Sequence, residues 1–216
     1  MHFRIFLALL CPLLVCAEEG QDGSKAKEAM VELKQFTPRI VVGLRYATRD
    51  NLARRTIYPK NARAFVRRGV AERLKRAQDW LDSNAPRGTR LKIWDAWRPQ
   101  WAHKILWSVL PDREYLGDPR NGGSLHTWGV AVDVTLVNSA GRELKMPTDF
   151  DEIGPASKTY YKGKDPDIAR NLYWLQAAMS KAGFYVVRDE WWHFCARDWK
   201  AYGEVDMSIT GDAVPD

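Results

Sequence analysis

The sequence is poor in the side chains on which several classes of site depend. Its 216 residues contain three cysteines and four histidines, and Cys11, Cys16 and His2 all lie near the N-terminus. If that end is removed, Cys195 is left alone, which excludes an intramolecular disulfide and a cysteine-based zinc site. The chain also lacks a phosphate-binding glycine loop, an HExxH helix and a GxSxG turn. It therefore does not fit the common nucleotide-binding, zinc-protease or serine-hydrolase patterns.

Residues 1–17 have the pattern of a secretory signal peptide. Arg4 precedes an apolar run that is too short to span a bilayer comfortably, and the run ends in residues suited to cleavage after Ala17. We therefore expect an exported protein, periplasmic or secreted, without a transmembrane anchor. A lipid on Cys16 is disfavoured because Val15 is a poor residue before a lipidated cysteine. A buried N-terminal strand or helix is the other alternative.

The composition of the chain is that of a compact globular protein. Hydrophobic residues make up 45% and aromatic residues 12%, which is enough for one domain with a sizeable core. The formal net charge of +6 is mild. The basic run at residues 53–68 fits a solvated surface with ion pairs better than a contact with an anionic polymer. Too few aromatic side chains lie near it for nucleic-acid stacking, so we expect no nucleic-acid partner.

Hydrophobic periodicity predicts one α+β domain over residues 39–216, after a polar lead-in at 18–38. Strands are expected at 39–47, 90–94, 130–137, 184–187 and 191–194. Helices are expected around 70–81, after Pro99, and from a cap at Asp165 to Gly183. Together these elements predict a small, mainly antiparallel sheet with helices packed against it.

The stretch SLHTWGVAVDVTL at residues 124–136 places an acid inside a predicted strand. Strict alternation puts the valines on one face of the strand and Asp133 on the other, so its charge need not enter the apolar core. A zinc hydrolase needs about three protein ligands and one open position for water. His126, Asp133 and His193 supply that set, which predicts one zinc ion at the sheet. His103 lies within a predicted helix and is assigned to structure or surface.

Zinc chemistry also needs a proton acceptor, and Glu190 is the available carboxylate near His193. In a regular strand, positions three apart face opposite sides. Both side chains can therefore reach one metal only if Glu190 lies in a loop or a twisted strand start. Each motif alone also fits a packed polar pair. Cys195 is expected to be a packed small hydrophobe, with a nucleophilic role beside His193 as the alternative.

Two motifs together resemble a known family. SLHTWGVAVDVTL fits the S-x-H-x-x-G-x-A-x-D pattern, and EWWHF fits the E-x-W-H pattern, of the zinc D-alanyl-D-alanine dipeptidases. These are the VanX-type enzymes associated with vancomycin resistance. LRYATRDN and WDAWRP are similar to further segments of that family in the same order, so the resemblance spans about residues 43–199. The metal motifs are specific for the wider D,D-peptidase superfamily, and the added segments favour its dipeptidase branch.

The resemblance implies a role for each matching position. His126, Asp133 and His193 would bind zinc, and Glu190 would be the catalytic base. Arg98 in DAWRP would stabilise the oxyanion of the tetrahedral intermediate, and an arginine fixed before a helix-opening proline is well placed for that task. The alternative for Arg98 is a surface ion pair with its neighbour Asp95.

The resemblance also implies contacts to a D-Ala-D-Ala or related dipeptide substrate. Ser124 would contact the substrate, and Tyr46 would line the pocket. Asp151 would receive the ammonium group of the dipeptide, although Asp149 is close enough to confuse the register. The chain departs from the family in Trp97, where tyrosine is common, and in the position of MPTDFDE, which lies one residue closer to the histidine motif.

The expected export separates this chain from the resistance enzymes, which act inside the cell on D-Ala-D-Ala. It favours the salvage or trimming of fragments of peptidoglycan from the cell wall. The alternatives are a D,D-carboxypeptidase or endopeptidase that trims peptidoglycan peptides, and a non-catalytic cell-wall-binding module. The presence of Glu190 argues against the last, because binding alone needs no base.

Overall fold

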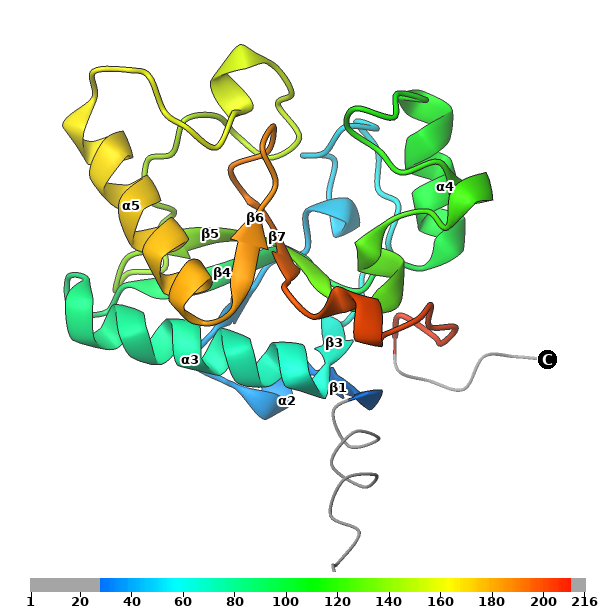
Figure 1. Cartoon of the computed structure of the whole chain (residues 1–216), viewed down its shortest axis with the longest axis horizontal. Helices are drawn as coiled ribbons and strands as arrows, with labels where there is room; N and C mark the ends of the chain where they lie inside the picture. Colours follow the sequence, from blue (N-terminus) through cyan, green and yellow to red (C-terminus); the bar gives the residue numbers. More distant parts are fainter. Residues whose placement is uncertain (1–27, 211–216) are drawn as a thin grey trace, which may run out of the picture.

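A five-stranded sheet organises residues 28–210, the part of the chain that the computed structural model describes (Figure 1). Its strand order is β2-β4-β5-β7-β6, with β2 at Val41–Val42, β4 at Arg90–Asp95, β5 at Ala131–Val137, β6 at Phe184–Val186 and β7 at His193–Ala196. Only β2 and β4 pair in parallel within this sheet. A separate antiparallel ladder joins β1 (Met30–Glu32) to β3 (Phe65–Arg67). The predicted α+β domain with a mainly antiparallel sheet is confirmed.

Two long helices cover one face of the sheet. They are α3 (Arg68–Asn84) and α5 (Pro166–Lys181), which pack against each other and against the strands (Figure 1). Asp165 caps α5 by accepting the backbone N–H groups of Asp167 and Ile168, as its sequence predicts. The shorter helices are α2 (Leu33–Phe36), α4 (Gln100–Val109) and the 3₁₀ turns η1 (Arg45–Ala47), η2 (Pro119–Asn121), η3 (Leu125–Trp128), η4 (Pro155–Ser157) and η5 (Trp199–Ala201). Within the described range, no helix is both long and apolar enough to cross a bilayer.

The two faces of β5 have different environments, although every residue of this strand is buried. Val132 and Val134 lie opposite Phe194 and Ile93 on the neighbouring strands and join the core beneath α3 and α5. Because side chains alternate along a strand, Asp133 faces the other side of the sheet. Loops rather than long helices cover that side, so this face is where a site can open.

The predicted strand at 39–47 is much shorter in the structure. Only Val41–Val42 forms β2, and the Gly43 N–H makes the last bond to the sheet, at Ile93 O. The chain then turns into η1, where the Tyr46 carbonyl accepts the N–H groups of Ile57 and Tyr58. The loop at residues 57–58 therefore supplies the hydrogen bonds to the Tyr46 carbonyl that a neighbouring strand would otherwise make. Likewise β7 begins at His193 and not at residue 191, because Trp191 and Trp192 belong to the preceding turn.

The predicted polar lead-in at 18–38 is wrong for its C-terminal part. Residues 30–36 form β1 and α2, and the Leu33 side chain is fully buried in the core. The Leu33 N–H donates to Ala64 O, which ties the segment to the start of β3. The sequence does indicate these two elements, through apolar residues at 30, 31, 33 and 36 within an otherwise polar stretch. The predicted signal peptide at 1–17 lies outside the described residues.

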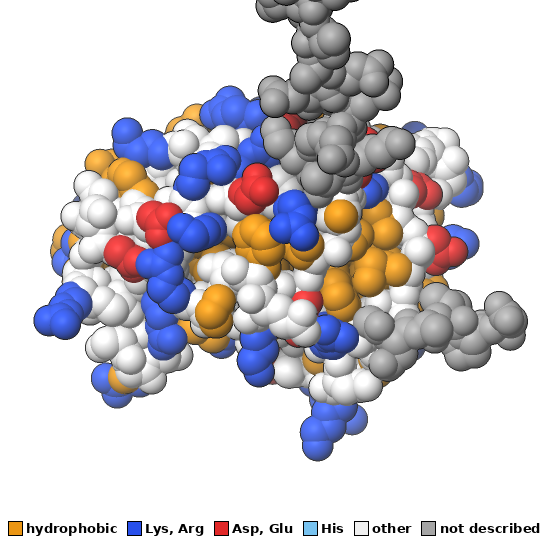
Figure 2. All heavy atoms as spheres, turned by 90° about the horizontal axis from the view of Figure 1, so that it is seen from below, with side chains coloured by type: hydrophobic (Ala, Val, Ile, Leu, Met, Phe, Trp, Pro, Cys, Tyr) orange, Lys and Arg blue, Asp and Glu red, His pale blue; other side chains and the backbone are white. Residues whose placement is uncertain are grey.

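On the face of the molecule drawn in Figure 2, basic side chains are dispersed rather than gathered in one patch. Figure 2 shows Lys and Arg interspersed with Asp and Glu on one face of the molecule, with hydrophobic side chains between them. Arg39, for example, pairs with both Asp79 and Asp82. In the basic run at 53–68, Arg63 pairs with Glu32, and Arg67 donates to the Trp128 carbonyl at 3.0 Å. These contacts fit the predicted solvated surface with internal ion pairs.

Candidate metal centre and active site

Three neighbouring strands place the central side chains of the site in one row. Asp133 on β5 lies opposite His193 on β7 and opposite Asp95 on β4. The pairing of β4 and β5 shifts between Ile93 and Asp95. Without this irregularity Trp94 would lie opposite Asp133, so the shift is what brings a second carboxylate beside it. Bulges of this kind often redirect a side chain next to an active site.

His126 enters the site from η3, just before β5. The hydroxyl of Ser124 accepts the His126 N–H at 3.3 Å, and Gly129 ends the turn with a φ of 71°, a conformation that glycine adopts without strain. The His126 Nδ1 lies 2.7 Å from the Ala96 carbonyl. Since a carbonyl can only accept, Nδ1 carries a proton, and in the neutral ring the lone pair of Nε2 faces the site.

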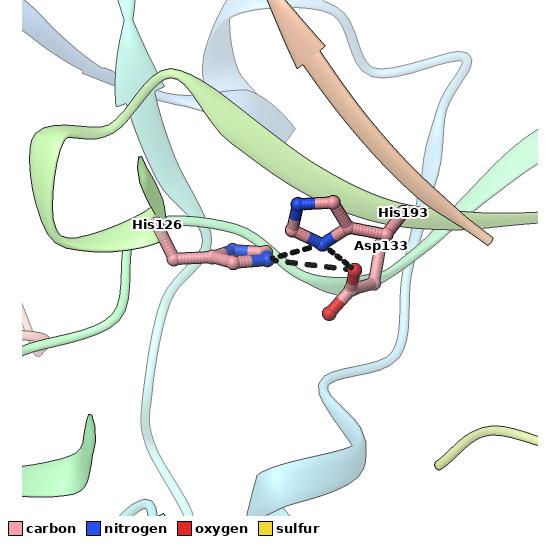
Figure 3. Close-up of side chains that lie close together, drawn as sticks. All are labelled: His126, Asp133 and His193. Carbon is pink, nitrogen blue, oxygen red and sulfur yellow. Dashed lines mark hydrogen bonds and ion pairs between the residues drawn. The ribbon is translucent and has the colours of Figure 1, made fainter. Parts of the chain in front are cut away.

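His126, Asp133 and His193 point toward one another (Figure 3). The His193 Nδ1 is 2.9 Å from Asp133 Oδ1 and 3.1 Å from His126 Nε2, and His126 Nε2 is 3.4 Å from Asp133 Oδ1. Ligand atoms held at 2.0–2.1 Å by one tetrahedral ion lie about 3.3 Å apart. The three separations and the lone pair on His126 therefore fit a divalent metal ion, and the predicted ligand set converges on one point.

Asp133 is ionised although its residue is only 2% exposed. Burial opposes the charged form, but His126 and His193 hold the pKa of Asp133 below its usual range. A carboxylate that is ionised before a metal arrives needs no proton removed to bind it.

Glu190 meets the geometric condition set by its sequence position. It lies in the turn between β6 and β7, outside the regular strand. The His193 N–H donates to the Glu190 carbonyl at 3.2 Å, which folds the turn back on itself. As a result, Glu190 Oε2 lies 3.8 Å from His193 Nδ1. Burial raises the pKa of Glu190 to about 7, and Asp133 and Asp151 add to the shift.

Arg98 is held between the two buried carboxylates. Its Nε donates to Asp95 Oδ2 at 2.9 Å, and its Nη2 lies 3.6 Å from Asp133 Oδ2. The Tyr58 hydroxyl donates to the other oxygen of Asp95 at 2.8 Å. The ion pair with Asp95 thus exists, but it is buried and borders the pocket rather than lying on the surface. The Asp95–Tyr58 contact has no signal in the sequence, because Tyr58 lies in an irregular loop.

The structure separates Asp151 from Asp149. Asp151 borders the pocket, accepts the Leu52 N–H at 2.8 Å and lies 3.4 Å from the Tyr46 hydroxyl. Its backbone has a φ of 57°, which an aspartate tolerates better than most residues. Because protein encloses the carboxylate, burial raises the pKa of Asp151 to about 7. Asp149 instead binds Arg45, and its side chain is 63% exposed.

One small pocket collects the predicted site residues, including Ser124. Its lining comprises Tyr46, Arg98, Tyr115, Leu116, Gly117, Ser124, His126, Asp133, Asp151, Glu190, Trp192 and His193. The cavity volume is about 40 Å³, close to the roughly 30 Å³ that one molecule occupies in liquid water. Sequence reasoning missed the wall at residues 115–117, which lies in a turn-rich loop without periodicity. It also missed Trp192, although this residue stands inside the second histidine motif.

His103 and Cys195 lie outside the ligand cluster. His103 is fully buried on α4, and its Nε2 donates to the Gly117 carbonyl at 2.7 Å. Burial lowers the pKa of His103 to about 4, so it is a neutral structural residue. Cys195 is buried on β7, but its sulfur lies 3.2 Å from His193 Nε2. It is therefore more than a packed hydrophobe.

Comparison with known proteins adds an independent line of evidence. A peptidase M15 family model described as D-ala-D-ala dipeptidase matches residues 26–207. The D-alanyl-D-alanine dipeptidase of Escherichia coli is 34% identical over 165 residues, which cover 76% of this chain and 83% of that protein. A D-alanyl-D-alanine dipeptidase of Synechocystis is 30% identical over 104 residues, or 43% of this chain and 40% of the relative.

The geometry of the cluster predicts which histidines the protein needs in order to bind a metal ion. We expect His126→Ala and His193→Ala to lose most bound divalent ion, since the two remaining ligands hold it poorly. His103→Gln is the matched control and should keep its metal. Metal content per chain is measured by atomic emission after dialysis, with circular dichroism to verify folding. Stoichiometric metal in either alanine variant contradicts the ligand set.

Proposed function

This chain belongs to the D-Ala-D-Ala dipeptidase family of M15 metallopeptidases, and we propose that it uses one zinc ion to hydrolyse D-alanyl-D-alanine or a similar D,D-dipeptide. The observation that carries the proposal is the convergence on one small pocket of three metal ligands, a carboxylate base, an arginine and a second carboxylate. Binding alone would need only the first of these groups.

The donor set favours zinc among the divalent ions. His126 and His193 offer imidazole nitrogens and Asp133 offers one carboxylate oxygen, a combination that suits a hydrolytic zinc site with one open position. An all-oxygen set would favour magnesium or calcium instead. When bound, the ion supplies Lewis acidity to the attacking water and to the scissile carbonyl.

Glu190 is placed to move the proton that hydrolysis requires. Attack on the scissile carbonyl needs an acceptor for a proton of water, and the departing amine needs a donor. The Glu190 carboxylate can do both in turn, as base and then as acid. Its position 3.8 Å from His193 Nδ1 supports this role, because it lies beside the ligand cluster without being part of it.

Arg98 is the group best placed to stabilise negative charge on the carbonyl oxygen. Its guanidinium is buried and borders the pocket, so its interaction with a developing oxyanion would be weakly screened. The hydrogen bond to Asp95 holds the Nε atom of the Arg98 guanidinium in place. The Nη2 side remains directed toward Asp133 and the pocket.

The far wall of the pocket favours a substrate with a free amino terminus. Asp151 is a partly enclosed carboxylate that would pair with the ammonium of a dipeptide, while Tyr46 and Ser124 would contact its remaining atoms. This terminal acid favours a dipeptide over a longer wall peptide, because it would pair with a free amino terminus next to the scissile bond. A D,D-carboxypeptidase or endopeptidase activity on peptidoglycan is the second candidate.

We propose that this enzyme is exported and acts on peptidoglycan fragments. The support is the signal-peptide pattern of residues 1–17. Mass spectrometry of protein from the native host should find a mature form that begins at Glu18. A chain that retains Met1, or that carries lipid on Cys16, would falsify the predicted processing.

The proposed activity predicts a specific defect in Glu190→Ala. The wild-type protein should hydrolyse D-Ala-D-Ala faster than L-Ala-L-Ala or a wall pentapeptide, and a chelator should abolish turnover. Glu190→Ala should retain zinc but lose about 10²–10⁴-fold in kcat, because positioned proton transfer is worth that much. Release of alanine is followed by a coupled assay or chromatography.

Asp189→Asn is the matched control for this variant. Asp189 is the neighbouring carboxylate and its side chain faces Lys158, so activity should persist. Near wild-type turnover by Glu190→Ala would refute the assigned base. Faster cleavage of the pentapeptide than of the dipeptide would instead support the second candidate.

Two neighbouring carboxylates allow a sharp test of substrate capture. Asp151→Asn should raise KM for D-Ala-D-Ala by about 10- to 100-fold, because a hydrogen bond to a charged group is worth about 1.5–3 kcal/mol. Its kcat should change little. Asp149→Asn should leave both constants unchanged, since Asp149 lies at the surface with Arg45. Steady-state kinetics decide the matter, and the reverse pattern would assign the ammonium site to Asp149.

A further inference from the structure

Cys195 lies on the same face of β7 as the metal-ligating residue His193. The two are separated by one residue, and side chains in a strand alternate between faces. Cys195 lies opposite Ala131 on β5 and Tyr185 on β6. It is only 2% exposed and is not among the side chains that border the pocket. The sulfur therefore cannot reach a substrate, which excludes the nucleophilic role that the sequence left open.

The two nitrogens of the His193 ring have different partners. Nδ1 faces Asp133 and His126, at 2.9 and 3.1 Å. Nε2 faces the Cys195 sulfur at 3.2 Å. A neutral imidazole that offers the Nδ1 lone pair to a metal carries its proton on Nε2. That proton then points at the sulfur, which is a weak acceptor.

The other histidine ligand is held in a corresponding way. His126 presents Nε2 to the cluster and donates its Nδ1 proton to the Ala96 carbonyl. Such outer contacts fix the tautomer and the orientation of the ring, and they usually end on a carboxylate, a carbonyl or water. At His193 the structure places a cysteine sulfur in that position.

We propose that Cys195 is a positioning residue whose sulfur accepts the His193 Nε2–H and holds Nδ1 toward the metal. Tyr185 lies directly opposite Cys195 on the neighbouring strand β6. The inference rests on the metal site proposed above. It adds a residue that touches neither substrate nor ion.

The test is the affinity for Zn²⁺ alone, measured by competition with a chromophoric chelator in metal-free protein. Cys195→Ala should raise the Kd for Zn²⁺ by about 10- to 100-fold, the usual cost of removing such a contact. Cys195→Ser should stay within about threefold of wild type, because a hydroxyl oxygen can accept the same N–H. The readout is independent of catalysis, so it remains valid even if D-Ala-D-Ala is not the substrate.

Ala131→Gly is the control for loss of packing. It removes a buried methyl group from the cross-strand neighbour of Cys195, and should lower the melting temperature while leaving Zn²⁺ affinity unchanged. The proposal is overturned if Cys195→Ala binds Zn²⁺ like the wild type, if serine is as weak as alanine, or if Ala131→Gly weakens binding equally. Retention of zinc by His193→Ala would instead overturn the metal site itself.

Should Cys195→Ala fail to fold, the wild type and Cys195→Ser still decide the question. In zinc-loaded protein with ¹⁵N-labelled histidine, the His193 Nε2–H should exchange slowly with solvent. Its resonance should move in Cys195→Ser, because the acceptor changes from sulfur to oxygen. A rapidly exchanging proton, or a resonance that is identical in both proteins, would contradict the contact.

Discussion

Two carboxylates lie opposite each other on adjacent strands, and Arg98 makes their burial possible. Asp95 and Asp133 form a register pair, an arrangement in which like charges repel. Buried ions cost several kcal/mol each unless partners compensate them. Arg98 contacts both carboxylates, while Tyr58 donates to the other oxygen of Asp95 and His193 Nδ1 lies 2.9 Å from Asp133 Oδ1. The positions of β4, β5 and η3 all depend on this arrangement.

Aromatic side chains keep the surroundings of these charges dry. Trp94, Phe150, Trp191 and Trp192 pack mostly edge to face beside the site, and Tyr46 packs on Phe150. With little water between them, charges interact strongly and unpaired carboxylates become harder to ionise. Glu190 and Asp151 are the carboxylates that show this effect. The shell therefore sets the electrostatics of the pocket as well as its shape.

Local patterns in the sequence were enough to predict most of the sheet, the long helices and the three side chains that converge as a candidate metal site. The alternation around Asp133 and the cap at Asp165 are encoded within a few positions, so they can be recognised without tertiary information. The segment around Tyr46 and the wall at 115–117 follow no period, because distant loops satisfy their backbones. The choice between Asp151 and Asp149 depends on a backbone with positive φ and a bond from Leu52. Neither the backbone conformation nor this long-range hydrogen bond can be read from the local sequence.

The register of β5 against β7 has a consequence for how the protein matures. Asp133 and His193 face the same side only because they are directly paired. A slip of one residue would send one of them to the opposite face of the sheet. A mispaired chain could still bury apolar surface, but it would have no complete ligand set. A metal ion would therefore bind only to molecules in which β5 and β7 are correctly paired. By binding to these molecules alone, it would stabilise the native register relative to the mispaired one.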